Sequence, residues 1–168
     1  MNNYISIITL NLNGLNAPIK RHRIAEWITK HDPHICCLQE THLRTKDLHR
    51  LKVKGWIKIF NANRQEKKAG VVILISEKID FQRRAIRRDP EGHYIILKGR
   101  IHQEDMDIEN IYARNIGAPK YIKKILEDFK KDIDSNTIIV RTLTPHCQKW
   151  TGLPKKISRR ILCHLTIP

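Results

Sequence analysis

The sequence has few acidic residues for its length. It contains 17 Asp and Glu against 32 Lys and Arg, which gives a formal net charge of +15 at pH 7. So large an imbalance suggests a polyanionic partner, and nucleic acid is the first candidate. A solvated basic surface, or a region that once belonged to a larger chain, is the alternative explanation of the same charge.

Long apolar runs and a cysteine framework are also missing. No run is long enough to span a bilayer, and residues 1–12 lack the basic start and unbroken apolar core of a signal peptide. Cys36 and Cys37 are neighbours, so on a strand they would point to opposite faces as core thiols. Cys147 and Cys163 each lie beside a histidine but lack the tight ligand pairs of most zinc sites. These absences predict an intracellular, reduced protein without a membrane partner.

Neither internal repeats nor low-complexity linkers interrupt the chain. Its 168 residues, 40% of them hydrophobic, are enough for one core and predict one domain. Strands are expected at residues 4–10, 35–38, 56–60, 70–76, 93–101, 106–113 and 137–140. Helices are expected from Pro18 to Asp32 and from Pro119 onward, with a weakly helical stretch at 45–54 and an ambiguous one at 79–86. The opening order of strand, helix and strand is typical of an α/β fold.

Two polar residues follow expected strands. Residues 35–38 are continuously apolar, which predicts a strand buried on both faces, and Glu40 comes shortly after it. Asn11 follows the first expected strand in the same way. Ligands in α/β proteins tend to lie beyond the carboxyl ends of strands, and a carboxylate beside an amide suits Mg²⁺. The alternative is that Glu40 starts a solvated loop and Asn11 is an ordinary turn residue.

Tyr112 and Asn115 lie at the end of another expected strand. Their hydroxyl and amide could hold a phosphate, or they could be a packed aromatic residue beside a loop asparagine. Basic segments that could contact phosphates, each also explicable as a solvated face, lie at residues 20–23, 64–68 and 83–88. His93, between Gly92 and Tyr94, is most simply part of a turn that enters a strand.

Four motifs together resemble one family. They are Thr-Leu-Asn-Leu-Asn-Gly-Leu-Asn at 9–16, Leu-Gln-Glu-Thr-His at 38–42, Ala-Gly-Val-Val-Ile-Leu at 69–74 and Asn-Ile-Tyr-Ala at 110–113. In order and spacing they resemble the endonuclease domain of LINE-type retrotransposons. That domain belongs to the endonuclease/exonuclease/phosphatase superfamily, together with the apurinic endonucleases and exonuclease III. The resemblance covers residues 4–140.

The resemblance implies a four-layer α/β sandwich, with two sheets inside and helices outside, that nicks one DNA strand by Mg²⁺-assisted hydrolysis. It implies that Glu40 holds the Mg²⁺ with Asn11 beside it, and that Tyr112 and Asn115 contact the scissile phosphate. Glu40 and Tyr112 are therefore the expected catalytic residues. The basic residues expected to contact DNA are Lys20, Arg21, Arg23, Lys67, Lys68 and Arg114. A functional chain of this kind is expected to be a nuclear monomer.

The chain departs from the family where the chemistry would be completed. Arg114 stands where the family usually has Pro, and Arg-Thr-Leu-Thr at 141–144 replaces its Gly-Asp-Phe-Asn motif. The later Asp and the terminal Ser-Asp-His are absent too, because the chain ends roughly seventy residues short of a complete domain. Family codons for Asp-Phe-Asn-Thr-Pro-Leu-Ser, read one base late, give the Thr-Leu-Thr-Pro-His-Cys-Gln found at 142–148. We therefore expect a C-terminally truncated domain at 1–140 and a non-homologous, irregular tail at 141–168.

Three hypotheses about function follow from these observations. The first is a LINE endonuclease by descent whose catalysis is lost with the missing motifs. The second is a non-catalytic basic module that still binds nucleic acid. The third is a superfamily relative acting on lipid or inositol phosphates, and both the +15 charge and the motif at 9–16 argue against it.

Overall fold

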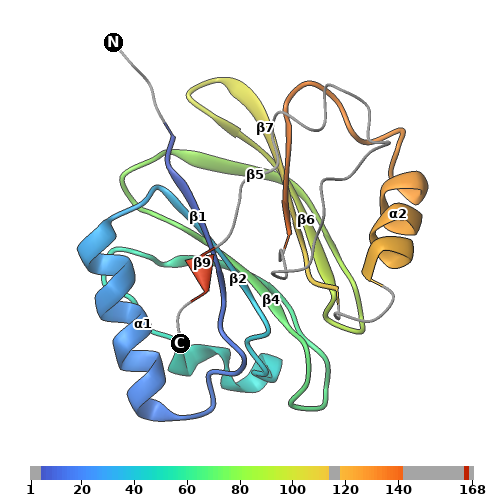
Figure 1. Ribbon diagram of the computed structural model, residues 1–168. Coiled ribbons are helices and arrows are strands. Elements are labelled where there is room, and N and C mark those ends of the chain that lie inside the picture. Colours follow the sequence, from blue (N-terminus) through green and yellow to red (C-terminus); the bar gives the residue numbers. More distant parts are fainter. Residues whose placement is uncertain (1–4, 114–117, 142–164, 167–168) are drawn as a thin grey trace.

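Two β-sheets form the centre of the molecule. The computed structural model describes residues 5–113, 118–141 and 165–166 (Figure 1). The first sheet has the order β3-β4-β2-β1-β9 and consists of β3 (Lys58–Ala62), β4 (Val71–Ile75), β2 (Ile35–Gln39), β1 (Ile7–Asn11) and β9 (Leu165–Thr166). The second has the order β5-β6-β7-β8 and consists of β5 (Phe81–Arg88), β6 (Tyr94–Ile101), β7 (Glu104–Ile111) and β8 (Thr137–Arg141).

Helices cover the outer faces of the sheets. Helix α1 (Pro18–His31) connects the parallel strands β1 and β2 and packs on the first sheet. As predicted, the helix begins at Pro18, whose missing N–H costs nothing there, and it ends at Asp32, which adopts the left-handed conformation. Helix α2 (Ala118–Asp128) packs on the second sheet, and a short 3₁₀ helix, η1 (Thr45–Arg50), follows β2.

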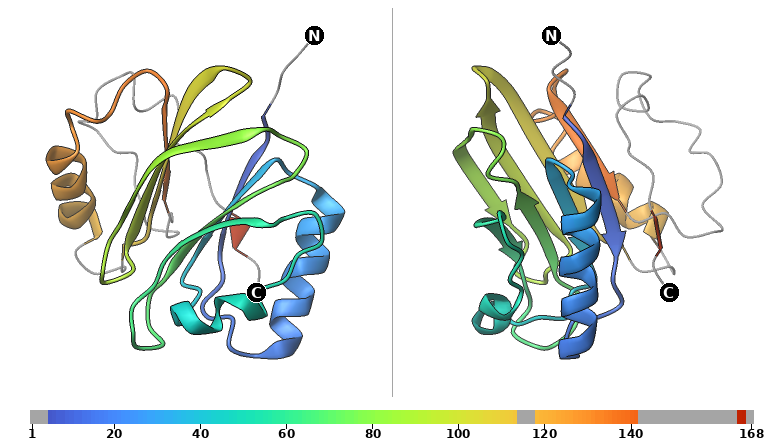
Figure 2. Two further views of the ribbon diagram at one scale, coloured as in Figure 1. Left: turned by 180° about the vertical axis from the view of Figure 1, so that it is seen from behind. Right: turned by 90° about the vertical axis from the view of Figure 1, so that its left-hand side faces the viewer.

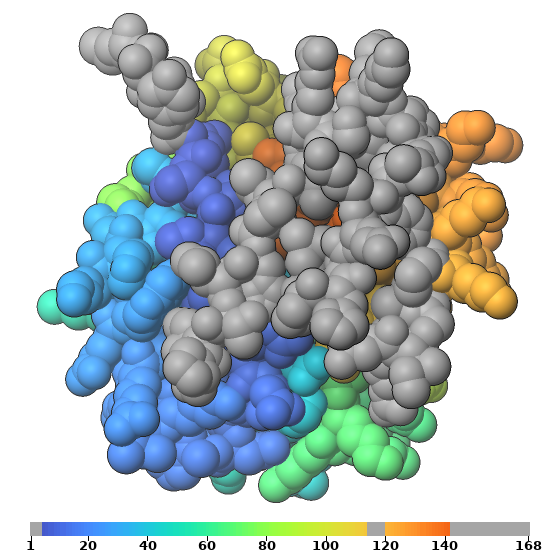
Figure 3. Space-filling view, in the orientation of Figure 1, coloured from blue at the N-terminus to red at the C-terminus, as the bar shows by residue number. Residues whose placement is uncertain are grey.

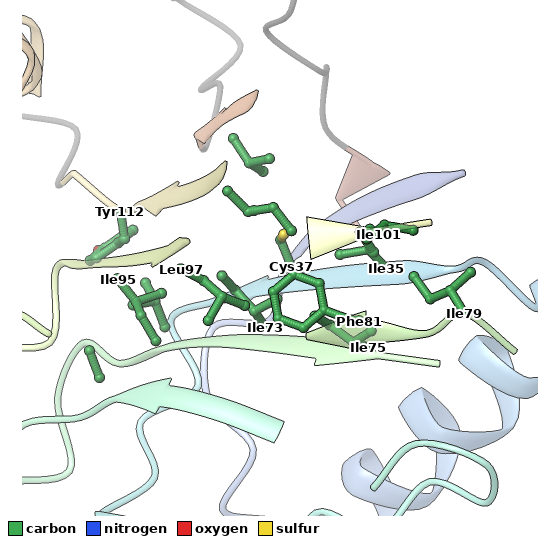
Figure 4. Close-up of a cluster of buried hydrophobic side chains, with 14 of the residues drawn as sticks. Ile35, Cys37, Ile73, Ile75, Ile79, Phe81, Ile95, Leu97, Ile101 and Tyr112 are labelled. Carbon is green, nitrogen blue, oxygen red and sulfur yellow. The ribbon is translucent and has the colours of Figure 1, made fainter. Parts of the chain in front are cut away.

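Three apolar clusters separate these layers. Ile73 and Leu97 belong to the cluster between the two sheets (Figure 4). Ile28 of α1 belongs to the second cluster, and Ile125 of α2 belongs to the third. The view from behind in Figure 2 shows the order helix, sheet, sheet, helix across the molecule. The predicted four-layer α/β sandwich is therefore confirmed.

Strand β2 contributes side chains to two of the clusters. Its five residues are all buried, as predicted from their apolar run. Cys36 lies in the cluster on the α1 side, and Cys37 lies in the cluster between the sheets (Figure 4). Burial raises the pKa of the Cys36 thiol, and it raises the pKa of the Cys37 thiol to about 12. The two neighbouring cysteines are thus core thiols on opposite faces of the sheet.

The observed elements differ from the expected ones mainly at their ends. The ambiguous stretch at 79–86 is the edge strand β5, whose many arginines hide the alternation of a strand. His102 and Gln103 both have positive φ and form a two-residue hairpin turn, so β7 begins at Glu104 rather than at 106. Helix α2 ends at Asp128, yet Phe129 still packs in the cluster beneath it.

The segment beyond residue 140 is described at three positions. Arg141 is the last residue of β8 and is buried. Leu165 and Thr166 form a short parallel strand beside Leu10 and Asn11 of β1. The structure differs here from the expected irregular tail, because the free edge of β1 offers backbone groups for pairing. The expected domain boundary at residue 140 stays a prediction.

Within the described residues, no helix has both the length and the apolarity that a bilayer span requires.

Candidate active site

The carboxyl ends of β1, β2 and β7 lie together at one edge of the sandwich, the lower edge in Figure 1, which we call the rim. Gln39 at the end of β2 donates its side-chain N–H to Asn110 Oδ1 on β7, at 2.7 Å across the gap between the sheets. The residues that follow these strands are therefore neighbours in space although they are far apart in the sequence.

Asn11 and Glu40 meet at the rim. Asn11 Nδ2 donates to Glu40 Oε1 at 3.3 Å, and Asn11 Oδ1 accepts from the backbone N–H of Asn13 at 3.2 Å. The Glu40 side chain keeps 19% of its surface exposed, and His42 Nε2 lies 4.0 Å from its other carboxylate oxygen. Parallel neighbouring strands thus bring the two side chains together, as the strand-end argument requires. The sequence analysis did not assign a role to His42.

The backbone around Glu40 is unusually rich in left-handed conformations. Glu40, His42 and Ala69 have φ of 51°, 54° and 54°, and Gly70 and Gly92 have φ of 98° and 73°. Left-handed backbone is unfavourable for residues with a Cβ, and such residues cluster at functional sites. The conformation directs Glu40 away from the axis of β2 and into the rim.

Three short connections hold this backbone in place. Thr41 N–H donates to Gly70 O at 3.2 Å, and His42 N–H donates to Ala69 O at 2.8 Å. Gly70 N–H in turn donates to Gly92 O at 3.0 Å. A Cβ on Gly70 would lie 2.5 Å from Thr41 Oγ1, so only glycine fits there. The loops after β2, before β4 and before β6 are thereby fixed to one another.

A buried polar network lies directly beneath the rim. Gln39 and Asn110 are both 0% exposed, and Gln39 Nε2 donates to Thr9 Oγ1 at 3.0 Å as well as to Asn110. Asn110 Nδ2 donates to Leu38 O at 3.1 Å and to Val72 O at 3.0 Å. The network fixes β7 against β1, β2 and β4. The motifs contained both amides, but nothing local in the sequence shows that they meet.

Tyr112 follows β7 and is 8% exposed. Its backbone N–H donates to His93 O at 2.6 Å, and the two rings lie 6.3 Å apart between centroids. Asp89 Oδ2 lies 3.3 Å from His93 Nδ1 and accepts the backbone N–H of His93 at 2.9 Å. Tyr121 of α2 meets the same His93 ring edge-on at 5.5 Å. His93 was expected to be a turn residue, and no site role was expected for Asp89.

Two basic residues expected to contact DNA donate hydrogen bonds to backbone carbonyls at the rim. Lys20 Nζ donates to Leu12 O, and Arg21 Nη1 donates to Leu15 O at 2.9 Å and to Asn16 O at 2.7 Å. Both side chains therefore support the loop between β1 and α1. Their expected contacts with DNA stay predictions.

The remaining basic candidates divide between exposed and undescribed residues. Arg23, Lys67 and Lys68 are exposed, and Lys68 Nζ lies 3.6 Å from Glu66 Oε2. Figure 3 shows the start of α1 in blue and the β3–β4 connection in green along the same lower edge of this face. Asn115 and Arg114 lie outside the described residues.

The sequence model of the Endonuclease/Exonuclease/phosphatase family matches residues 8–163. The chain belongs to this family. The family is named for its endonucleases, exonucleases and phosphatases.

Solved structures of the same fold agree with this assignment. TDP2 from D. rerio, crystallised with a single-strand DNA product, has a TM-score of 0.60 at 14% identity, over 80% of this chain and 58% of that one. Truncated TDP2 from Caenorhabditis elegans has a TM-score of 0.66 at 17% identity, over 90% and 66% of the two chains. A functionally unknown protein from Enterococcus faecalis V583 has a TM-score of 0.64 at 16% identity, over 82% and 66%. These likenesses concern the fold, and the chain spans less than two thirds of TDP2 from D. rerio.

The donor groups of this family member suit a hard cation in part. Glu40 supplies one accessible carboxylate, and Mg²⁺ commonly takes one or two carboxylates and keeps several waters. Among the described residues, no group of three or more His, Cys, Asp or Glu is placed to enclose a metal. Asn11 faces Glu40 with its amide nitrogen, so in this arrangement it orients the carboxylate. The rim therefore offers an open, one-carboxylate site.

Proposed function

We propose that this chain is the N-terminal part of a LINE-type retrotransposon endonuclease, whose rim binds a DNA strand for Mg²⁺-assisted phosphodiester hydrolysis. The observation that carries the proposal is the contact between Asn11 and Glu40 at 3.3 Å, at the end of two parallel strands. The motif at 9–16 and the motif at 38–42 supply these two residues, and their combination resembles the retrotransposon branch of the family.

In this proposal each rim residue has a defined task. A bound Mg²⁺ would supply charge neutralisation at the scissile phosphate. Glu40 holds the ion, and Asn11 keeps the carboxylate turned toward it. Tyr112 and Asn115 contact the phosphate, and the exposed Arg23, Lys67 and Lys68 hold the strand on either side.

We further propose that this chain hydrolyses DNA very slowly or not at all. Hydrolysis needs an oriented water and a stabilised leaving oxygen in addition to the metal, and Arg-Thr-Leu-Thr at 141–144 replaces the Asp and Asn of the family's Gly-Asp-Phe-Asn motif. Catalytic groups act as a unit, so losing several costs on the order of 10⁴-fold or more in rate. A reading-frame slip near residue 141 would account for the loss, and the genomic DNA around codon 141 would show it in another frame.

Nicking and binding assays on the full chain test the proposal. We expect salt-sensitive, sequence-indifferent binding of a labelled duplex, with log affinity falling linearly with log salt concentration. We expect no nicking of supercoiled plasmid in Mg²⁺. Nicking that disappears in Glu40→Ala would contradict the proposed inactivity but support the site. Absence of any DNA binding would contradict the proposal as a whole.

A non-catalytic nucleic-acid-binding module is the second candidate. The scarcity of metal ligands around Glu40 in the described residues favours it, together with the net charge of +15. The two candidates differ in their response to Glu40→Gln. This change should remove any Mg²⁺-dependent part of DNA binding in the first case and strengthen binding slightly, by removing a negative charge, in the second.

A further inference from the structure

His93 connects the backbone near Glu40 to that of Tyr112 at the rim. Gly92, just before it, accepts the hydrogen bond from Gly70, which in turn accepts one from Thr41 beside Glu40. His93 O accepts the backbone N–H of Tyr112 on the other side at 2.6 Å. A continuous series of backbone contacts therefore runs from Glu40 to Tyr112 through this histidine.

Asp89 fixes the imidazole ring of His93. The carboxylate lies 3.3 Å from Nδ1 and also accepts the backbone N–H of His93 at 2.9 Å. Asp89 is nearly buried, with 12% of its side chain exposed, whereas the His93 side chain is 25% exposed. A ring nitrogen that faces a carboxylate carries the proton, which leaves Nε2 as the nitrogen available to other groups.

Aromatic rings enclose the same imidazole. Tyr112 lies 6.3 Å away with its ring plane at 29° to the imidazole, and Tyr121 meets it at 5.5 Å and 74°. Burial first, and then the Asp89 charge, raise the pKa of Tyr121, so this residue stays neutral. Among the described residues, Asp89 is the charged group in contact with the His93 side chain, and Glu91, two residues before His93, lies 3.3 Å from Arg64. The ring is held in one orientation at a partly exposed position.

We propose that His93 is a further phosphate-binding residue of the rim, contacting a backbone phosphate of the bound nucleic-acid strand beside Tyr112, with Asp89 as its positioning residue. The inference rests on the proposed function, because it names an additional contact in the same site. An imidazolium oriented by a carboxylate is a good donor to a phosphate oxygen. Imidazole side chains in general change charge between pH 5 and 8, so pH is the variable that tests this contact.

The experiment compares binding of a fluorescent single-stranded oligonucleotide to the full chain at pH 6 and pH 8, at one salt concentration. The wild-type chain should bind more weakly at pH 8, and His93→Gln should reduce affinity about 3- to 10-fold at pH 6 with little effect at pH 8. His31→Gln is the matched control, because His31 is exposed at the C-terminal end of α1, near the start of β2 and opposite the rim, with Nδ1 2.9 Å from Trp27 O. It should keep the wild-type dependence on pH.

Asp89→Asn tests the positioning role separately. It should weaken binding at pH 6 in the wild-type background and have no added effect in the His93→Gln background, because it acts through His93. Additive effects of the two changes, or a His93→Gln variant with the wild-type pH profile, would overturn the inference. In that second case the wild-type chain still binds, so the proposed function stands. A wild-type chain that binds no oligonucleotide would overturn both.

Discussion

Two adjacent residues of β7 are buried on opposite faces of the same sheet and have opposite surroundings. Asn110 points between the sheets, where its amide makes hydrogen bonds to Gln39, Leu38 and Val72. Glu109 is 1% exposed on the α2 side, and its Oε2 has no hydrogen-bond partner among the described residues. A buried polar group stabilises a fold only where its partners are already placed, and β7 shows both outcomes one residue apart.

Electrostatics sharpen the contrast. The pKa of Glu109 is raised to about 7, mainly by burial and also by the charges of Asp107 and Asp132, and the charge of Lys98 opposes this rise. Lys98 Nζ is already shared between Asp132 at 3.3 Å and Asp107 at 3.9 Å. The face of β7 between the sheets therefore provides hydrogen-bond partners for Asn110, whereas the α2 face buries Glu109 without such partners for its Oε2.

The largest expected effect comes from removing the amide of Asn110. Asn110→Leu leaves Leu38 O, Val72 O and Gln39 Nε2 without this partner, and each such group costs about 1–3 kcal/mol. We expect a loss of about 3–5 kcal/mol in the free energy of unfolding, measured by urea titration. Thr9→Val is the matched change, which removes one contact and should cost about 1 kcal/mol. Equal losses in the two variants would show that the amide network is not what joins the sheets.

Removing the charge of Glu109 should act in the opposite direction. The folded-state pKa of about 7 lies above the ordinary glutamate value of 4.5, so the native state binds more protons between these pH values and stability falls as pH rises through them. Glu109→Gln should therefore raise the free energy of unfolding by up to about 3 kcal/mol at pH 8 and have little effect at pH 4.5. Urea titrations at the two pH values measure the difference. Glu104→Gln, at the exposed start of the same strand, should show no such gain, and a gain in both variants would contradict the explanation.

A smaller effect is expected at the rim backbone. Ala69 has φ of 54°, which is unfavourable for any residue with a Cβ, and its carbonyl accepts the N–H of His42. Ala69→Gly should therefore stabilise the chain by about 0.5–1 kcal/mol. Ala62→Gly, at the buried last residue of strand β3, should destabilise it by a similar amount. Thermal unfolding of the two variants measures the sign, and a loss of stability in Ala69→Gly would show that the left-handed conformation is not strained.

Features that depend on residues close together in the sequence were predicted correctly. The apolar run before Glu40 predicted a fully buried strand, Pro18 and Asp32 marked the ends of α1, and adjacent cysteines were expected on opposite faces. The approach of Asn11 to Glu40 followed from the rule that parallel strands end at one edge. The strand β5 was missed as a strand because its exposed arginines obscure the period of two.

Contacts between layers could not be predicted in the same way. Gln39 and Asn110 are 71 residues apart in the sequence, and their meeting depends on how the two sheets stack. His93 and Tyr112 are joined by a sheet register that the sequence does not state. Lys20 and Arg21 donate to carbonyls of the loop before α1, a contact that the sequence did not indicate, and their expected contacts with DNA stay predictions. The roles assigned to Glu40, Asn11, Tyr112 and Asn115 stay predictions.

The labelling rates of the two thiols of β2 report how often the layers of the molecule separate. Thiol reagents attack the thiolate, and a pKa of about 12 for Cys37 leaves almost none of it at neutral pH. Modification of these buried thiols therefore requires that the layers separate. Cys36 becomes reactive when α1 lifts from the first sheet, and Cys37 when the two sheets part, so their labelling rates time two different openings. A labelling rate that is higher at Cys36 than at Cys37 would mean that α1 detaches while the sandwich behind the rim remains closed.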